Sequence, residues 1–412
     1  MAKRTLNVDL LLGAIIVLIF IGFSHIKPFF FEGIENYVYE SALRFSPGEK
    51  QGVSQVVLIN IDDKSLTRLG SWPWPRHLIG EMIDILKAGG VKLIGLNIPL
   101  FDKQANLGLD VLRSFHEKFK AYPFGDKDPT MAAWMQEHLK QMEKDLDSDR
   151  RLVESVLRSG NVVLPASVEL GSSPDGTERG GDARLSKESL TSAQLSESLR
   201  RRVSAKRVSI PFPELAQNAL GMGHDRLALE NRMAGRSHLM FVNYKGFLLP
   251  SFPLRLAIAY EDLQPNKVTV VENQIRLKGR SIAINKGELL VRFRNNQAPF
   301  PQYPFVDILR ARQAQPILKG KIALIGLNAL ESRRRISPAP SNVSEGVMIA
   351  NILENIISAT FITRPPFMFH FEILSIFLLG GIASLFFPRM GGLSKTALAG
   401  GLIILPLLTG IA

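Results

Sequence analysis

The central part of the chain alternates continuous apolar runs with amphipathic segments. Residues 56–61 (VVLINI) form an apolar run rich in Val and Ile, which is typical of a strand buried on both faces. In residues 76–88 apolar side chains recur at helical spacing, at Leu78, Met82, Ile85 and Leu86. Gly89 and Gly90 end this helix, and residues 91–96 are the next buried strand. This strand–helix–strand unit predicts parallel strands joined by a right-handed crossover.

The same pattern continues downstream and predicts an α/β fold with a mixed, largely parallel sheet flanked by helices. Further strands are expected at residues 161–165, 239–243, 289–293 and 321–326. Further helices are expected at residues 131–144, 147–159, 253–261, 306–311 and 346–359. Two segments interrupt the pattern and are expected to be insertions. Residues 101–146 carry extra helical material, whereas residues 171–207 are rich in Gly, Ser and charge and predict a mobile loop.

Three apolar segments near the ends of the chain predict transmembrane helices. Leu10–Phe23 is uninterrupted and, with its flanks, approaches the roughly 20 residues that span a bilayer. A second segment covers residues 367–387, and a third begins near Thr396 and is still apolar at Ala412. A cleaved signal peptide is the alternative for the first segment, but no small-x-small cleavage site follows it, which favours a retained anchor.

The basic residues beside these segments predict the orientation in the membrane. Lys3, Arg4, Arg389 and Lys395 flank the apolar segments in short stretches, and such residues mark the cytoplasmic side. The expected organisation is a cytoplasmic start and first span in residues 1–29, an extracytoplasmic domain in 30–366, and an apparently truncated transmembrane hairpin in 367–412. The expected location is therefore the inner (plasma) membrane, with several spans.

The composition limits the kinds of chemistry that the chain can perform and the kinds of partner that it can bind. The chain has 412 residues and no cysteine, which excludes disulfides and thiolate metal sites. His116, His138 and His224 lack metal-ligand spacing, so neither a metal nor a cofactor is expected. The net charge of +12 suits an anionic surface. The predicted spans make the lipid bilayer the expected partner and argue against nucleic acid, so the basic residues Arg200–Arg202 are interpreted as a solvated loop end.

Polar residues follow several predicted strands and form a candidate ligand site. These residues are Asp62, Asp63, Asn97, Ser167 and Asn328. Ligands of open α/β sheets bind outside the carboxyl ends of the strands. Trp72, Trp74 and Arg76 follow the first strand and are candidates for its walls, and Arg76 is a candidate partner for Asp62, Asp63 or an anion.

A purely structural interpretation of the same residues stays open. In this interpretation Asp62 accepts backbone N–H groups, and Asp63 caps a helix near residues 65–69. Trp72 and Trp74 then cover the core edge, with the intervening prolines fixing their directions. A catalytic carboxylate pair is disfavoured because adjacent residues in an extended segment point to opposite sides.

Several motifs, in order, resemble the type-two CHASE domain, a sensory extracellular domain associated with cyclases and histidine kinases. IDDKSL, GSWPWPR and LKAGGVKLIGLNIPLF resemble its opening, and DRRLVESVLRSGNVVLP its third strand with the preceding helix. FPQYPFVDIL with LKGKIALIG resembles its late part, and GVMIANILENIISATFITRPP its exit helix. The resemblance covers residues 30–366.

The resemblance implies an extracytoplasmic sensor for an unknown small molecule or envelope component, attached to a cytoplasmic output. Such outputs are adenylate or guanylate cyclases, histidine kinases, diguanylate cyclases or Ser/Thr kinases. No catalytic motif of these classes is recognisable in the sequence, so the chain itself is not expected to be an enzyme. The signal is expected to leave along the exit helix through Arg364, Pro365 and Pro366, in a homodimer. The alternatives are an extracytoplasmic enzyme that uses Asp62 and Asp63, and an envelope scaffold.

The sequence departs from the family pattern at acidic positions. Asn97 stands where the family usually has Asp, and the exit helix reads GVMIAN, without the usual Glu and His. Arg333, Arg334 and Arg335 add basic charge near the late strand. These changes imply a different ligand from that of other members, or none.

Overall fold

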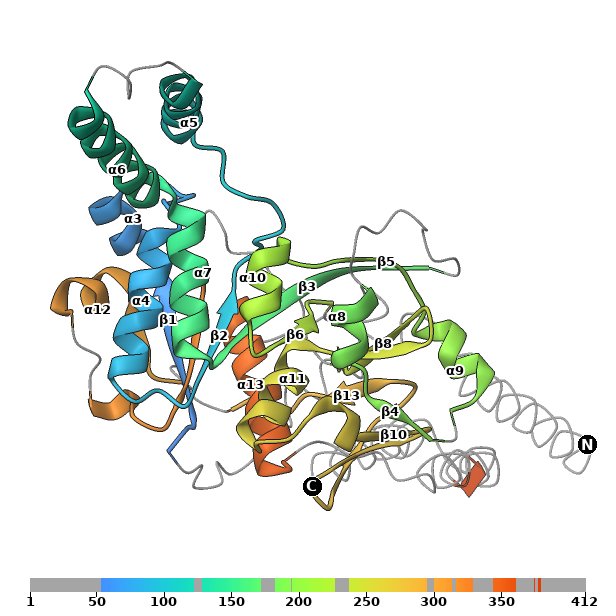
Figure 1. Ribbon diagram of the computed structural model, residues 1–412. Helices are drawn as coiled ribbons and strands as arrows, with labels where there is room; N and C mark the ends of the chain where they lie inside the picture. The colour runs from blue at the N-terminus through green and yellow to red at the C-terminus, as the bar shows by residue number, and fades with distance from the viewer. Residues whose placement is uncertain are drawn as a thin grey trace, which may run out of the picture. The chain divides into compact units, whose positions relative to one another are not determined.

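A computed structural model describes most of the central part of the chain (Figure 1). The described residues are 53–121, 128–171, 182–193, 195–226, 237–294, 300–312, 316–328 and 344–360, with Leu374, Phe377 and Leu378. By contacts the chain divides into two compact units, Gln51–Ile362 and a unit made of Met1–Lys50 with Thr363–Ala412. The fold below is that of the first unit.

The predicted membrane spans fall almost entirely outside the described residues. Of the segments at 10–23, 367–387 and beyond 396, the structure describes only Leu374, Phe377 and Leu378. Among the residues that are described, no helix is both long enough and apolar enough to cross a membrane. The spans therefore stay a prediction from the sequence.

A seven-stranded sheet with the order β14–β1–β15–β2–β3–β5, and with β6 also paired to β3, forms the centre of the unit. Its strands are β1 (Val56–Ile61), β2 (Leu93–Asn97), β3 (Val162–Leu170), β5 (Ala205–Ser209), β6 (Gly221–His224), β14 (Gln302–Pro304) and β15 (Ile322–Leu327). All neighbours are parallel except β3 and β5. The predicted α/β fold with a largely parallel sheet is confirmed.

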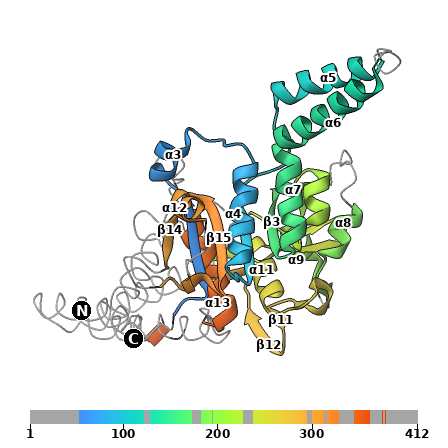
Figure 2. The same cartoon turned by 60° about the vertical axis from the view of Figure 1, so that its left-hand side comes forward.

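Helices cover both faces of the sheet because its strands are apolar on both sides (Figure 2). In β1, Val57 and Ile59 belong to one core, and Val56 and Leu58 to the other. The first core packs against α3 (Asp63–Leu69), α4 (His77–Ala88), α7 (Ser148–Ser159), α10 (Pro213–Asn218) and α12 (Phe305–Ala311). The second core packs against α11 (Phe252–Tyr260) and α13 (Glu345–Ser358). The alternating burial along each strand thus places one helical layer on each face.

Strands β1 and β2 are parallel, as predicted, but they are not neighbours. The late strand β15 lies between them, so that Leu324 is in register with Leu58 on one side and with Gly95 on the other. The carboxyl ends of β1, β15 and β2 therefore meet side by side at one edge of the sheet. We call this edge the carboxyl rim.

Smaller β-structures pack beside the second core. A four-stranded sheet has the order β12–β11–β10–β4, made of Arg280–Ala283, Gln274–Leu277, Thr269–Val271 and Thr191–Ser192. Two-stranded pairs join β7 (Ser237–Leu239) to β13 (Glu288–Leu290), and β8 (Phe241–Tyr244) to β9 (Phe247–Pro250). Single-turn 3₁₀ helices cover Pro265–Lys267 and Pro316–Leu318. The prediction of one strand over residues 239–243 is wrong, because the chain breaks at Met240 and its two halves pair with different strands.

The prediction of a mobile loop over residues 171–207 is wrong for its described part. That part contains α8 (Asp182–Lys187), β4, α9 (Glu197–Arg202) and most of β5, while residues 172–181 and 194 lie outside the described residues. Its sparse apolar side chains are buried, namely Leu185, Leu190, Leu199 and Val203. The sequence pattern did not predict that these four side chains are buried, because charged residues outnumber them in this segment.

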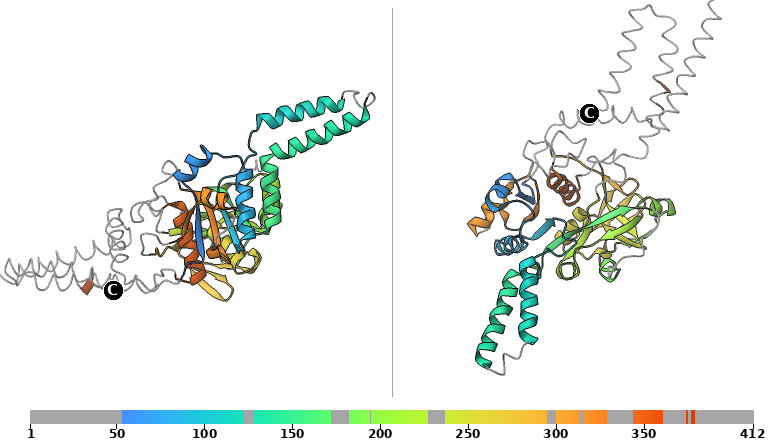
Figure 3. Two further views of the ribbon diagram at one scale, coloured as in Figure 1. Left: turned by 90° about the vertical axis from the view of Figure 1, so that its left-hand side faces the viewer. Right: turned by 90° about the horizontal axis from the view of Figure 1, so that it is seen from above.

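The other predicted insertion, residues 101–146, contains an antiparallel helical hairpin. Helices α5 (Leu107–Ala121) and α6 (Pro129–Leu146) pack against each other and project from the sheet-and-helix body of the unit (Figures 1 and 3). Leu109 and His116 of α5 and Ala132 and Leu139 of α6 are buried along the hairpin seam. Whether the hairpin is an insertion relative to other members stays a prediction.

Strand β6 approaches α11 so closely that only glycine fits on its inner side. A Cβ atom at Gly223 would lie 2.7 Å from backbone atoms of Ser251 and Phe252, and one at Gly221 would overlap the Arg255 guanidinium. The sequence GMGH is therefore a strand in which small residues allow close backbone contact.

Candidate functional site

Asp62, the first candidate residue after β1, caps a helix. Its Oδ1 atom accepts hydrogen bonds from the backbone N–H of Ser65 (2.9 Å) and from the Ser65 hydroxyl (2.7 Å). The same hydroxyl accepts from the backbone N–H of Val306, which ties α3 to α12. The cap that was assigned to Asp63 in the structural interpretation therefore belongs to Asp62, and Asp63 is an exposed residue of the first turn.

A polar recess of about 320 Å³ lies at the ends of β1, β14 and β15. Its lining residues are Asn60, Asp62, Asp63, Lys64, Gln302, Tyr303, Pro304 and Asn328. Asn60 donates to the Gln302 side chain (2.8 Å), and Lys64 forms an ion pair with Asp307 (2.6 Å). The Oδ1 atom of Asn328 is buried and has no hydrogen-bond partner among the described residues.

A second, small recess adjoins the first and reaches the start of the exit helix α13. It holds about 10 Å³, which is room for roughly one water molecule. Asn60 and Asn328 line both recesses, whereas Asn97 and the first turn of α13, at Ser344 and Gly346, line the small one. The structure therefore brings Asp62, Asp63, Asn97 and Asn328 to one rim, as the parallel strands predicted.

Trp74 belongs to the protein core and lines neither rim recess. Its side chain is 2% exposed, its Nε1 donates to the Gly70 carbonyl (2.7 Å), and its ring lies 5.2 Å from that of Phe305. Trp72 packs edge-on against it at 5.4 Å and is partly buried. Aromatic walls at the rim were therefore a wrong prediction, because the Trp-Pro-Trp-Pro turn carries both rings onto the first core.

Arg76 pairs with a carboxylate that sequence reasoning did not consider. Its guanidinium forms an ion pair with Asp149 at the start of α7 (2.6 Å) and lies over the Phe212 ring at 5.4 Å. Asp149 also accepts from the backbone N–H of Gln104 (2.8 Å). The predicted pairing with Asp62 or Asp63 is wrong, because the partner is supplied by a residue 73 positions later in the chain.

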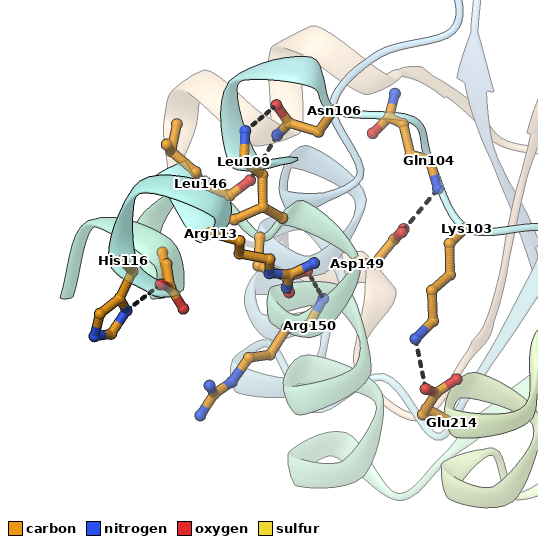
Figure 4. A network of polar contacts seen from close by, with 12 residues as sticks. Lys103, Gln104, Asn106, Leu109, Arg113, His116, Leu146, Asp149, Arg150 and Glu214 are labelled. Carbon is orange, nitrogen blue, oxygen red and sulfur yellow. Dashed lines mark hydrogen bonds and ion pairs between the residues drawn. The ribbon is translucent and has the colours of Figure 1, made fainter. Parts of the chain in front are cut away.

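A larger cavity, of about 550 Å³, lies at the base of the α5–α6 hairpin (Figure 4). It is formed by residues 103–106, α5, the start of α7 and α10. Six of its charged wall residues form ion pairs with one another: Lys103 with Glu214, Arg113 with Asp147, and Arg150 with Glu154. A ligand would have to compete with these pairs, whereas the Asn328 oxygen at the rim has no partner in the described part of the chain.

The exit helix α13 is fastened to the residues that lead into β1. The carboxylate of Glu354 accepts from the Ser54 hydroxyl and from the backbone N–H of Gln55 (2.7 Å). The side chains of Asn351 and Asn355 accept from backbone N–H groups at Arg294 and Arg292. We call the Glu354 contacts the entry–exit clamp, because they join the start of the unit to its last helix.

A comparison with protein families identifies the fold. A family model of the CHASE2 domain matches residues 12–385, which include every element described above. The chain belongs to the CHASE2 domain family. Members are extracytoplasmic sensory domains of membrane proteins, so this chain carries such a domain. Searches of curated proteins and of solved structures gave no significant match.

Two carboxylates of the CHASE2 domain, Asp225 and Glu345, lie close enough to repel each other, which the sequence did not predict. Asp225 lies just after β6, and burial raises the pKa of its carboxyl group. Repulsion from Glu345 at the start of α13 raises this pKa further, whereas hydrogen bonds from Ser167 and from the Val168 backbone lower it. Ser167, which was expected at a strand end, lies inside β3, because this strand continues to Leu170. Strand β6 was not predicted, because GMGH is short and rich in Gly. Asp225 therefore extends the carboxyl rim toward the first turn of α13.

The described part of the CHASE2 domain contains no evident metal-binding site. Among the residues that the structure describes, no group of three or more His, Asp or Glu side chains is arranged to hold a metal ion. The prediction that the chain uses neither metal nor cofactor stays a prediction. Arg364, Pro365 and Pro366, the expected signal exit, lie outside the described residues.

Acid is expected to destabilise the CHASE2 domain through His224. This side chain is 1% exposed, and desolvation lowers its pKa well below 6.5; the nearby His238 adds to this effect and a backbone hydrogen bond at Arg226 opposes it. The unfolded chain therefore binds one more proton below pH 6.5. The free energy of unfolding should fall by up to about 1.4 kcal/mol per pH unit as the pH drops from neutrality through this range.

Urea denaturation of the full chain between pH 7.5 and 5 measures this slope. His224→Gln does not titrate, so its stability should depend less on pH than that of the wild type, by about one proton. Equal slopes for the two proteins would show that His224 is already protonated in the folded state or is not buried.

Proposed function

We propose that this chain is a multi-pass, homodimeric receptor part in the plasma membrane, which detects a small polar ligand at the carboxyl rim of its CHASE2 domain. The exit helix α13 then passes the signal across the bilayer to a cytoplasmic output, either a cyclase, a histidine kinase, a diguanylate cyclase or a Ser/Thr kinase. The observation that carries the proposal is the small rim recess, which the first turn of α13 lines together with Asn97 and Asn328. A group that enters the small recess therefore touches the start of the helix that leaves the domain, and Asn60 and Asn328 connect this recess to the larger one.

The composition of the rim favours a ligand that donates hydrogen bonds. Asn60, Asn97 and Asn328 offer amides, and the Asn328 oxygen has no partner among the described residues. Among the described residues, the charged groups that line the larger recess are Asp62, Asp63 and Lys64, and Lys64 is paired with Asp307. The described lining therefore suits a neutral or cationic polar molecule better than an anion.

Transmission requires that the ligand favour one packing of α13 over another. The helix is buried along its middle, and its asparagines hold backbone groups at Arg292 and Arg294. A ligand that contacts Ser344 and Gly346 acts on the first turn of this helix rather than on its buried middle. The alternative of an enzyme that uses Asp62 gains no support, because the Oδ1 atom of this carboxylate caps α3.

Ligand binding to the full chain in nanodiscs tests the proposal. Thermal-shift measurements against sugars, amino acids and peptidoglycan fragments, with inorganic phosphate as the anionic comparison, should give a stabilising neutral or cationic compound. Calorimetry of that compound should show about tenfold weaker binding to Asn97→Ala and to Asn328→Ala, because each loses a hydrogen bond to the ligand. The matched control is Asn218→Ala, on the exposed part of α10, which should bind as the wild type does.

A spin label on α13 separates sensing from mere binding. The chain has no cysteine, so Ala359→Cys gives one labelling position at the end of the exit helix. The compound should change the spectrum of this label, and should not do so in the Asn97→Ala background. Equal binding to all variants would exclude the rim site, and consumption of the compound would show an enzyme rather than a sensor.

A further inference from the structure

The α5–α6 hairpin exposes large apolar side chains on its outer side. Leu107, Val111 and Phe115 of α5 are 79%, 62% and 51% exposed. Met131, Trp134 and Met142 of α6 are 48%, 53% and 51% exposed. Soluble surfaces rarely gather so many large apolar groups unless the patch binds something.

These side chains form two stripes on the same face of the hairpin. In α5 the stripe recurs every four residues, and in α6 it runs from Met131 through Trp134 and His138 to Met142. In each helix the stripe lies roughly a third of a turn from the buried seam, in the same rotational sense. Because the two helices run antiparallel, both stripes face the same way. We call this surface the outer hairpin face.

The bilayer does not suit the outer hairpin face. In the described unit the hairpin projects at one end, and the exit helix α13 finishes at the opposite end (Figures 1 and 2). The predicted second span follows α13, so the end that carries the hairpin is the end away from that connection. Trp, Phe and Met side chains with a charged border are typical of the core of a protein–protein interface.

The size of the face suits an interface between two hairpins. Helix α6 has 18 residues and is about 27 Å long, and two helices side by side are about 20 Å wide. Two such faces packed together approach the roughly 800 Å² per partner of a standard interface. The same surface on both subunits is the simplest closed arrangement, a two-fold dimer.

The charges that border the stripes select an antiparallel arrangement. Lys118, at the end of α5, lies beside the stripe near the hairpin tip, whereas Asp110 at the start of α5 and Asp145 at the end of α6 lie beside the stripes near the base. A parallel arrangement would place the lysines of both tips together, and an antiparallel one places each tip beside an acidic base. We propose that a second copy of this chain occupies the outer hairpin face, so that two hairpins form an antiparallel four-helix bundle.

Disulfide cross-linking of the full chain in membranes tests this arrangement, since the sequence has no native cysteine. Phe115→Cys lies near the middle of the face, close to the expected two-fold axis, and should form covalent dimers readily on oxidation. The control is Leu157→Cys on α7, which is 60% exposed but lies off the hairpin, and should not. Equal cross-linking of both variants, or heavier bands with another protein only, would overturn the proposal.

A second measurement does not depend on the exact register. In detergent, the double variant Phe115→Glu/Trp134→Glu should dimerise at least tenfold more weakly than the wild type by light scattering, while Leu157→Glu should be unchanged. A wild-type monomer, or a dimer that survives the double change, would overturn the proposal. Quenching of Trp134 by brominated lipid in nanodiscs would show that the face binds the bilayer instead.

Discussion

Glu188→Ala is expected to lower the free energy of unfolding of the CHASE2 domain by about 3–5 kcal/mol. The Glu188 and Arg255 side chains are only 2% and 5% exposed, and their Oε2 and Nε atoms are 2.5 Å apart. Arg184 contacts the other carboxylate oxygen at 3.3 Å, and Arg255 also donates to the Leu220 carbonyl. Removing the carboxylate leaves a buried guanidinium without its counter-charge, which is the costly half of breaking a buried pair.

Urea denaturation followed by circular dichroism measures the loss. Glu197→Ala is the matched control, because it removes an exposed partner of Arg201 and should cost no more than about 1 kcal/mol. The double variant Glu188→Ala/Arg255→Met removes both charges and should recover part of the loss. A Glu188→Ala protein as stable as the control would contradict the buried pair.

Trp74→Ala is expected to cost a similar amount, about 3–5 kcal/mol, because it empties the space of a fully buried aromatic ring. The ring fills the first core between Phe305 and Trp72, and its Nε1–H is satisfied by the Gly70 carbonyl. Trp74→Phe should restore most of the stability, since it returns an aromatic ring without the hydrogen bond. Thermal and urea unfolding followed by circular dichroism check both variants.

Trp72→Ala is the comparison that separates the two interpretations of the Trp-Pro-Trp-Pro turn. Trp72 is only partly buried, so its loss should cost clearly less stability than that of Trp74. Neither change should weaken binding of a rim ligand, because neither ring lines the rim recesses. A Trp74→Ala protein with wild-type stability but lost ligand binding would restore the aromatic-wall hypothesis.

Elements with long apolar runs could be predicted closely from the sequence. Strand β1 has the predicted limits, and α13 begins and ends within one residue of the prediction. In both, most residues are buried, so apolar side chains dominate the segment over most of its length. The break at Met240 was missed because apolar residues continue across it, and only pairing with two different strands separates β7 from β8.

The candidate site was predictable only as far as strand direction determines it. Parallel strands place their polar ends at one rim, and the structure brings Asp62, Asn97 and Asn328 there. Partners that depend on tertiary packing were not predictable. Arg76 reaches Asp149 because α4 packs against α7, and Asp225 interacts electrostatically with Glu345, which is 120 positions later in the chain. No local pattern encodes either neighbour.

The entry–exit clamp limits the kind of movement that one copy of the domain can send toward a membrane. Glu354 holds the segment before β1 and α13 together, so a ligand that displaces α13 carries the incoming chain with it. The segment that enters the domain before β1 and the helix α13 that leaves it then move together, and the distance between them stays fixed. In the homodimer that we propose, the signal that crosses the bilayer would then be a change in the position of one subunit relative to the other.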